Sequence, residues 1–205
     1  MKDLLFPENG WIEITPRIQI PSSKDQSWLF KASSLASKWL GRDEVPDVLK
    51  LLSINSSIFW SWLHFASKLM PYGKLSSRIS ELIILRVAWL CRCRYEWGQH
   101  IEIGQRRAKL TEQDIFNISK GYTAFQDEKE KSIILACDQL TLNNFIEQNN
   151  WDTLNNHLNT SQIIELQMLI GHYSMLAGVI NSSGLQLEYS IENNLQEFYR
   201  RIQNL

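Results

Sequence analysis

The stretch from Ile79 to Leu90 constrains the fold of this chain more than any other. Wound as an α-helix, it carries apolar side chains on almost every side, and the exceptions are Ser80, Glu81 and Arg86. A helix that is apolar all round is one that other elements enclose. The stretch therefore predicts a central, buried helix in a domain built from helices.

Helical patterning continues along most of the chain, and no strand-like alternation longer than a few residues interrupts it. We expect an all-α fold, a compact helical domain over residues 27–205. Residues 1–26 hold three of the five prolines and predict an irregular N-terminal arm. Residues 143–150 are mostly polar and are interpreted as a connector. Helix starts are predicted at Pro46, Ser56 or Ser57, Ser76 or Ser77, Arg94, Thr111, Asp127 and Ser161.

Composition excludes several classes of protein. The 205 residues are 44% hydrophobic, enough for a core, and the net charge of −1 leaves no overall electrostatic attraction to nucleic acid. The longest apolar run contains Arg86 and is far shorter than a membrane span of about 20 residues. No signal sequence is visible, so we expect a cytoplasmic protein that binds neither membrane nor nucleic acid. Three cysteines are an odd, sparse set, so a cysteine that matters acts as a thiol.

The residues after this helix hold the candidate chemistry. On a helix with about 100° per residue, Cys93, Glu96 and His100 fall on one side, which borders the apolar stripe that includes Trp97. A thiol, a carboxylate and an imidazole are therefore expected together at the edge of the core. A helix start near Cys93, and a charged His100, would lower the pKa of its thiol. The opposite, solvated side is predicted to hold Gln99, Glu102 and Arg106.

Two charged residues of the central helix need partners. Glu81 lies among apolar neighbours, and burial would raise the pKa of its carboxyl and suit it to proton transfer. Its alternative role is a buried ion pair with an arginine. Arg86 must find either an anionic partner or the carboxylate of a ligand.

The sequence around these residues resembles the carboxymuconolactone decarboxylase family, which includes the alkylhydroperoxidase D-like proteins. The resemblance runs from about Val45 to Leu187 and is most specific at Ser80-Glu-Leu-Ile-Ile-Leu-Arg-Val-Ala-Trp-Leu90 and Cys93-Arg-Tyr-Glu-Trp-Gly-Gln-His100. It implies an all-α fold that assembles into homo-oligomers, trimers or hexamers. By motif spacing, Glu81, Cys93 and His100 match the glutamate, the first cysteine of a Cys-x-x-Cys and the histidine of the alkylhydroperoxidase D-like members.

The chain departs from that motif at one position, because Glu96 stands where the second cysteine is expected. Our first hypothesis is a thiol-dependent, peroxiredoxin-like antioxidant enzyme. Cys93 would attack a hydroperoxide, Glu96 and His100 would relay the proton, and Glu81 would support them. The resulting sulfenic acid would be resolved by an external thiol reductant or by Cys91. The second is a decarboxylase or isomerase acting on a small lactone or carboxylic acid, with His100 as acid or base and Arg86 or another cation holding the substrate carboxylate.

Further residues are candidates for the walls of a substrate site. They are Arg86, Tyr95, Trp97, His64 and His172, and the alternative for each aromatic or histidine is ordinary packing in the core. We predict no metal site and no cofactor, because no second ligand cluster or phosphate-binding loop accompanies the motif. A third hypothesis is a non-enzymatic oligomer whose pocket binds a small molecule.

Overall fold

The computed structural model describes residues 6–21, Phe30 and residues 45–202. The remaining parts of the predicted arm and of the start of the predicted domain lie outside the described residues. The described part contains helices and no strand, so the all-α prediction is confirmed. The elements are α2 (Asp47–Ser53), α3 (Ser56–Leu69), α4 (Ser77–Leu90), α5 (Arg94–Arg107), α6 (Glu112–Lys120), the 3-10 turn η2 (Tyr122–Ala124), α7 (Glu128–Asn143), α8 (Gln148–His157), α9 (Thr160–Ser183) and α10 (Tyr189–Ile202).

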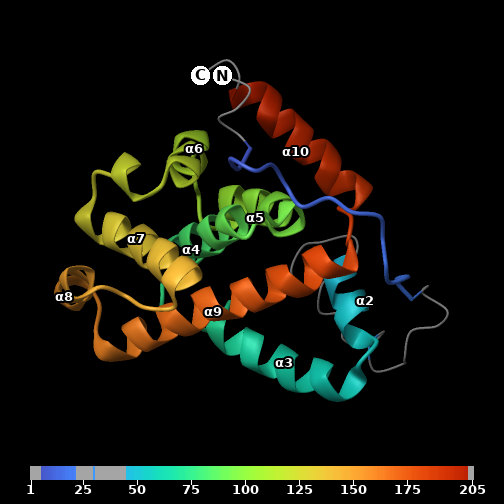
Figure 1. The fold of residues 1–205 in the computed structure, drawn as a ribbon, viewed down its shortest axis with the longest axis horizontal. Helices are drawn as coiled ribbons and strands as arrows, with labels where there is room; N and C mark the ends of the chain where they lie inside the picture. Colours follow the sequence, from blue (N-terminus) through green and yellow to red (C-terminus); the bar gives the residue numbers. More distant parts are fainter. Residues whose placement is uncertain (1–5, 22–29, 31–44, 203–205) are drawn as a thin grey trace.

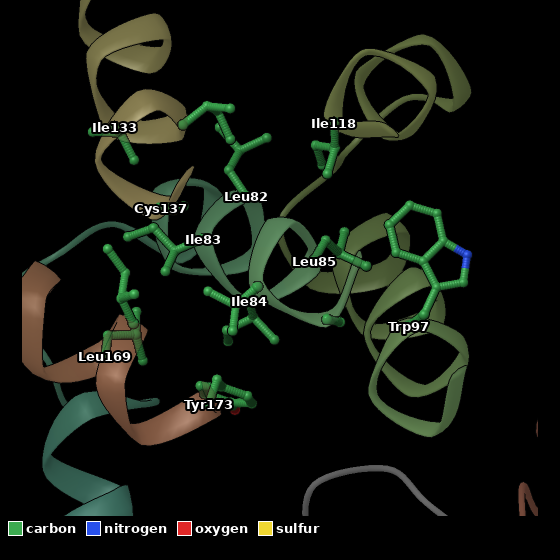
Figure 2. Packing of buried hydrophobic residues seen from close by; sticks show 14 of the residues in the cluster. Leu82, Ile83, Ile84, Leu85, Trp97, Ile118, Ile133, Cys137, Leu169 and Tyr173 are labelled. Carbon is green, nitrogen blue, oxygen red and sulfur yellow. The ribbon is translucent and has the colours of Figure 1, made fainter. Parts of the chain in front are cut away.

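Helix α4 is the centre of the molecule, as its sequence predicts. It contacts α5, α6, α7 and α9, and its residues 79–88 are all buried. Figure 2 shows its core side chains surrounded by residues of these four helices: Trp97, Ile118, Ile133, Cys137, Leu169 and Tyr173. Burying a large aliphatic side chain contributes roughly 1.5–3 kcal/mol, so α4 supplies much of the hydrophobic stabilisation.

The helix ends follow the local chemistry of their caps. The Ser76 side chain accepts a hydrogen bond from the Ile79 backbone N–H, and Thr111 and Asp114 form a reciprocal capping box before α6. Gly121 ends α6 with a φ of 90°, a conformation that favours glycine. The start of α3 differs slightly from expectation, because Asn55 caps it.

Two helices were not expected from the sequence. Residues 148–150 of the predicted connector already belong to α8, and α10 follows α9 after a short link. Helix α8 has a polar sequence with only Asn150 and Leu154 buried, so its apolar pattern is weak. Helix α10 is amphipathic and packs on α5, and its buried residues at helical spacing were a readable signal: Ile191, Leu195, Phe198, Tyr199 and Ile202.

The described part of the N-terminal arm is irregular, as predicted, and it is anchored to the helical domain. The backbone N–H of Ile12 donates to the Arg92 carbonyl, and the Arg17 N–H donates to the Ser183 carbonyl. Trp11 is buried against Trp89 and Trp97, with ring centroids 5.5 Å and 5.7 Å away. The arm therefore completes the core where α4 meets α5.

Helix α9 crosses the molecule between α3 and α4 (Figure 1). It is the one described helix that is long and apolar enough to span a membrane, and half of its most apolar window is buried in the protein. Burial of that kind is typical of a core helix. Together α2, α3, α5 and α9 surround the space next to His100.

Candidate active site

A tight connection between α4 and α5 brings the predicted catalytic residues together. Cys91 ends α4, Arg92 takes a φ of 54°, and Cys93 is the N-terminal cap of α5. The reversal places Glu81 beside His100, with Glu81 Oε2 2.8 Å from His100 Nδ1. One turn before His100 on α5, Glu96 places its Oε2 3.3 Å from His100 Nε2.

These three polar side chains form a buried proton-handling array. Glu81, Glu96 and His100 are only 2%, 3% and 5% exposed. Burial disfavours the charged imidazole, but the two carboxylates outweigh it, Glu81 more than Glu96, and raise the pKa of His100 to about 9. At neutral pH His100 is therefore an imidazolium whose two N–H groups point to carboxylate oxygens.

The array opens on a cavity of about 200 Å³ that has mostly apolar walls. Helices α2, α3 and α9 supply most of these walls, and α5 supplies Ile103 and the polar groups Glu96, Gln99 and His100. The ring of Tyr173 meets His100 edge-on, with centroids 5.3 Å apart. A concave, mostly apolar cavity with few polar groups is the usual form of a small-molecule site. Its apolar residues include Val48, Leu49, Trp62, Ala66, Met70, Ile103, Tyr173 and Leu176.

Cys93 differs from the expectation for a reactive thiol. Its side chain is fully buried, and it is not among the described residues that line the His100 cavity. Burial raises the pKa of the Cys93 thiol, and the Glu96 carboxylate raises it further, while the backbone N–H groups of Glu96 and Tyr95 act in the opposite direction. The prediction of a lowered thiol pKa is wrong because desolvation outweighs the helix start.

Arg86 is bound within the protein and lies away from the cavity. Its Nε donates to Asp138 Oδ1 at 2.6 Å, and its Nη1 donates to the Ile118 carbonyl at 2.7 Å. Gly121 leaves room for the guanidinium, since a Cβ there would lie 3.0 Å from Nη2. Of the two roles left open for Arg86, the structure supports the anionic partner and gives no support to a substrate carboxylate.

The remaining wall candidates separate into two groups. Tyr95 and His172 line the His100 cavity, and His172 stacks on Trp62 with ring centroids 5.9 Å apart. Burial lowers the pKa of His172, so it is neutral at pH 7. Trp97 is fully buried against Trp11 and Trp89, and His64 is exposed on α3. The expectation that Trp97 and His64 contact substrate is not supported, because neither lines the cavity.

One polar element of the site was missed. Gln99 was expected on the solvated side of its helix, but it is buried and lines the cavity. Its Nε2 donates to Glu188 Oε2 at 2.5 Å, and the Tyr95 hydroxyl donates to Glu188 Oε1 at 2.7 Å. Glu188 also accepts the backbone N–H of Asp47 at 2.6 Å. Glu188 therefore links α2 to α5. No local sequence pattern predicts the contact between Gln99 and Glu188, because the two residues are 89 positions apart.

No group of three or more His, Cys, Asp and Glu in the described part of the chain is arranged to hold a metal ion.

Residues 57–127, from the first turn of α3 to the residue before α7, match the carboxymuconolactone decarboxylase family. That segment contains Glu81, Glu96 and His100. Over this segment the chain is similar to that family. None of the curated protein sequences matches the chain.

Solved structures extend the likeness beyond the matched segment. An uncharacterized peroxidase-related protein of Silicibacter sp. TM1040 is 16% identical, with a TM-score of 0.75 over 86% of this chain and 93% of its own. One from Ralstonia eutropha JMP134, an alkylhydroperoxidase AhpD core, is 13% identical, with a TM-score of 0.76 over 86% and 94%. The debrominase Bmp8 is 12% identical, with a TM-score of 0.74 over 91% and 99%. At such identities the likeness shows the shared fold.

Proposed function

We propose that this protein is an enzyme that performs acid–base catalysis on a small organic molecule, as a decarboxylase or isomerase does. One observation carries the proposal: Glu81, His100 and Glu96 form a continuous buried array, and its Glu96–His100 end lines an apolar cavity. The family and the position of Glu96 in place of a second cysteine support the same chemistry.

Each polar group has a distinct part in this reaction. Glu96 accepts a proton from the substrate, and the His100 imidazolium donates the Nε2 proton to the oxygen or carbon where negative charge develops. In a decarboxylation the C–C bond breaks, carbon dioxide leaves, and the electron pair left on the substrate takes up that proton. Glu81 acts as a positioning residue, because its bond to Nδ1 holds the ring and stabilises its positive charge.

Variants of the array test this proposal. Turnover of a panel of unsaturated lactones and β-keto acids is measured for the full chain and for His100→Ala, Glu96→Gln and Cys93→Ser. General acid–base groups contribute about 10²- to 10⁴-fold, so the first two variants should lose that much kcat. Cys93→Ser should stay near wild type, and His64→Ala is the matched histidine control. Full activity of His100→Ala would overturn the proposal.

Reduction of hydroperoxides by Cys93 is the second candidate, and the position of the thiol favours it. Cys93 caps α5, and the Tyr95 and Glu96 backbone N–H groups stabilise a thiolate there. The thiolate would attack the terminal oxygen of the O–O bond, release an alcohol and become a sulfenic acid. One external thiol would convert the sulfenic acid into a mixed disulfide with release of water, and a second would reduce that disulfide and restore the Cys93 thiol. Burial of the thiol makes this candidate the weaker of the two.

Mass analysis after mild peroxide treatment separates the two candidates. Loss of peroxide consumption in Cys93→Ser, with a sulfenic acid on Cys93 of the parent, would favour the peroxidase. An unmodified Cys93 and no peroxide consumption would remove it. Absence of any turnover would leave the small-molecule-binding oligomer as the better description.

The homo-oligomer and the thiol reductant stay predictions. One described feature supports self-association: α9 exposes apolar residues at spacings of four and seven along one side, Ile164, Met168, Met175 and Val179, with Gly171 and Gly178 between them. Light scattering with size-exclusion chromatography measures the oligomeric state directly.

A further inference from the structure

Two polar rings in the wall of the His100 cavity have unpaired nitrogen atoms. Trp62 on α3 and His172 on α9 both line the cavity, and their rings stack with an angle of 19° between the planes. Within the described part of the chain, Trp62 Nε1 and His172 Nδ1 are buried and have no hydrogen-bond partner. Nearly all buried polar groups in proteins are paired, either with protein or with a bound molecule. The two unpaired nitrogens therefore indicate that this wall meets a polar group from outside the chain.

His172 can present a nitrogen to the cavity without breaking a hydrogen bond. Its side chain is 6% exposed, and its described ring contacts are with Trp62, Phe65 and Tyr173. A half-turn about the Cβ–Cγ bond exchanges Nδ1 with Cδ2 and keeps the ring in the same plane. Because burial lowers the pKa of His172, the ring is neutral at pH 7 and has one N–H donor and one nitrogen acceptor. A hydroxyl group, which both donates and accepts, fits either tautomer.

His100 and His172 are close enough for one small molecule to touch both. The Tyr173 ring meets each imidazole nearly edge-on, and the ring centroids are 5.3 Å apart in both cases. The two imidazole centroids therefore lie no more than twice that distance from each other. Both rings line the same cavity of about 200 Å³. A molecule built on one substituted benzene ring can extend from one imidazole to the other.

The charges around this cavity disfavour an anion. Glu81, His100 and Glu96 together hold two carboxylates and one imidazolium, so the net charge of the array is −1. The described residues that line the cavity include no Lys or Arg, and Arg86 is already bound to Asp138. Because the walls are mostly apolar, the Glu96 carboxylate is poorly screened. A ligand carboxylate would be repelled here, whereas an uncharged carbonyl can accept the Nε2–H of His100.

We propose that the His100 cavity binds an uncharged molecule with a carbonyl at one end and a hydroxyl at the other. The carbonyl oxygen accepts the Nε2–H of His100 beside Glu96, and the hydroxyl forms a hydrogen bond with a ring nitrogen of His172. His172 is therefore the residue that selects a hydroxylated substrate. The inference rests on the proposed function, because it takes the His100 cavity as the place where the substrate reacts.

The inference narrows the proposed function to isomerisation of an uncharged carbonyl compound into its enol. Glu96 takes the proton of the C–H bond next to the carbonyl, and the electron pair of that bond forms the C=C bond. The π pair of the carbonyl forms an O–H bond with the Nε2 proton of His100. When the enol has left, the proton passes from Glu96 to His100 Nε2, which is 3.3 Å from Oε2, and the array returns to its starting state.

Calorimetric titration of three matched probes tests the inference. The first probe, 4-(4-hydroxyphenyl)butan-2-one, has both polar groups. The second, 3-(4-hydroxyphenyl)propanoate, has a charged oxygen in place of the ketone methyl, and the third, 4-(4-methylphenyl)butan-2-one, has a methyl in place of the hydroxyl. The full chain should bind the first probe about tenfold tighter than the anion, because like charges repel, and about fivefold tighter than the methyl probe, because one neutral hydrogen bond is lost.

His172→Phe removes the ring nitrogens and keeps an aromatic ring against Trp62. This variant should lose the preference for the hydroxyl and keep the preference for the ketone over the anion. His64→Ala, on the exposed side of α3, is the matched control and should bind all three probes as the parent does. NMR of the parent gives a readout that needs no variant to fold. The His172 ring signals should shift with the first probe and much less with the third.

Other results overturn the inference. They are binding of the anion at least as tight as that of the ketone, an unchanged hydroxyl preference in His172→Phe, equal responses of the His172 signals to the first and third probes, or binding of no probe. Turnover keeps the two proposals apart. Full turnover by His100→Ala would remove the acid–base proposal and leave the binding assignment standing. Loss of turnover in His100→Ala together with tighter binding of the anion would remove the inference alone.

Discussion

Helix α4 contributes a charged residue to each of two buried polar clusters, and these residues, Glu81 and Arg86, are only five positions apart. The two clusters have different roles. Glu81 is 2% exposed and Arg86 is 8% exposed, and each has a short hydrogen bond to a neighbouring helix. The Glu81 cluster continues through His100 to Glu96 and ends at a cavity. The Arg86 cluster is closed by Asp138 and the Ile118 carbonyl. A buried charge therefore marks a candidate site only where its bonding leaves a polar group facing open space.

The largest expected effect comes from breaking the closed cluster. Arg86→Met should destabilise the fold by about 3–5 kcal/mol, because it leaves the Asp138 carboxylate without its partner in a poorly solvated place. Urea unfolding measures the change. The double variant Arg86→Met/Asp138→Leu should recover part of the loss. Loss of ligand binding with unchanged stability would instead place Arg86 in the substrate site. The distinction between a closed Arg86 cluster and an open Glu81 cluster would then be wrong.

The open cluster should give a pH-dependent stability. The folded-state pKa of His100 is raised to about 9 from an unfolded value of 6.5, so its stabilising contribution is complete below pH 6.5. It is lost as the pH rises through 9. Between those values the free energy of unfolding should fall by about 1.4 kcal/mol per pH unit relative to His100→Gln. Equal pH profiles for parent and variant would show that His100 is not the imidazolium described.

The smallest effect distinguishes a histidine of the cavity wall from an exposed histidine on α3. His172→Ala removes part of the cavity wall and its stacking on Trp62, so it should lower turnover of the lactone and β-keto acid panel several-fold and cost about 1–2 kcal/mol of stability. His64→Ala changes an exposed side chain and should stay within about 0.5 kcal/mol. Equal effects of the two variants on turnover would show that His172 does not line the cavity that holds the substrate.

The local sequence predicted the helices well, but it predicted how deeply individual side chains are buried less well. Caps at Ser76 and Thr111 were readable because they depend on residues three positions apart. The placement of Glu96 and His100 on one side of α5 was also readable. Cys93 shares that side. The helix angle gives the direction in which a side chain points but not how much of it neighbouring helices cover, so the sequence did not show that the Cys93 thiol is fully buried.

By itself the sequence determined an all-α chain with a central buried helix, a resemblance to the carboxymuconolactone decarboxylase family, and a carboxylate–imidazole pair at helical spacing on α5. These properties depend on neighbours within one or two helical turns. Only the tertiary structure decided that Glu81 joins His100, that Arg86 is closed off by Asp138, and that Gln99 faces the cavity with Glu188 behind it. Those outcomes depend on contacts between helices distant in sequence, where packing selects one partner among several of suitable charge.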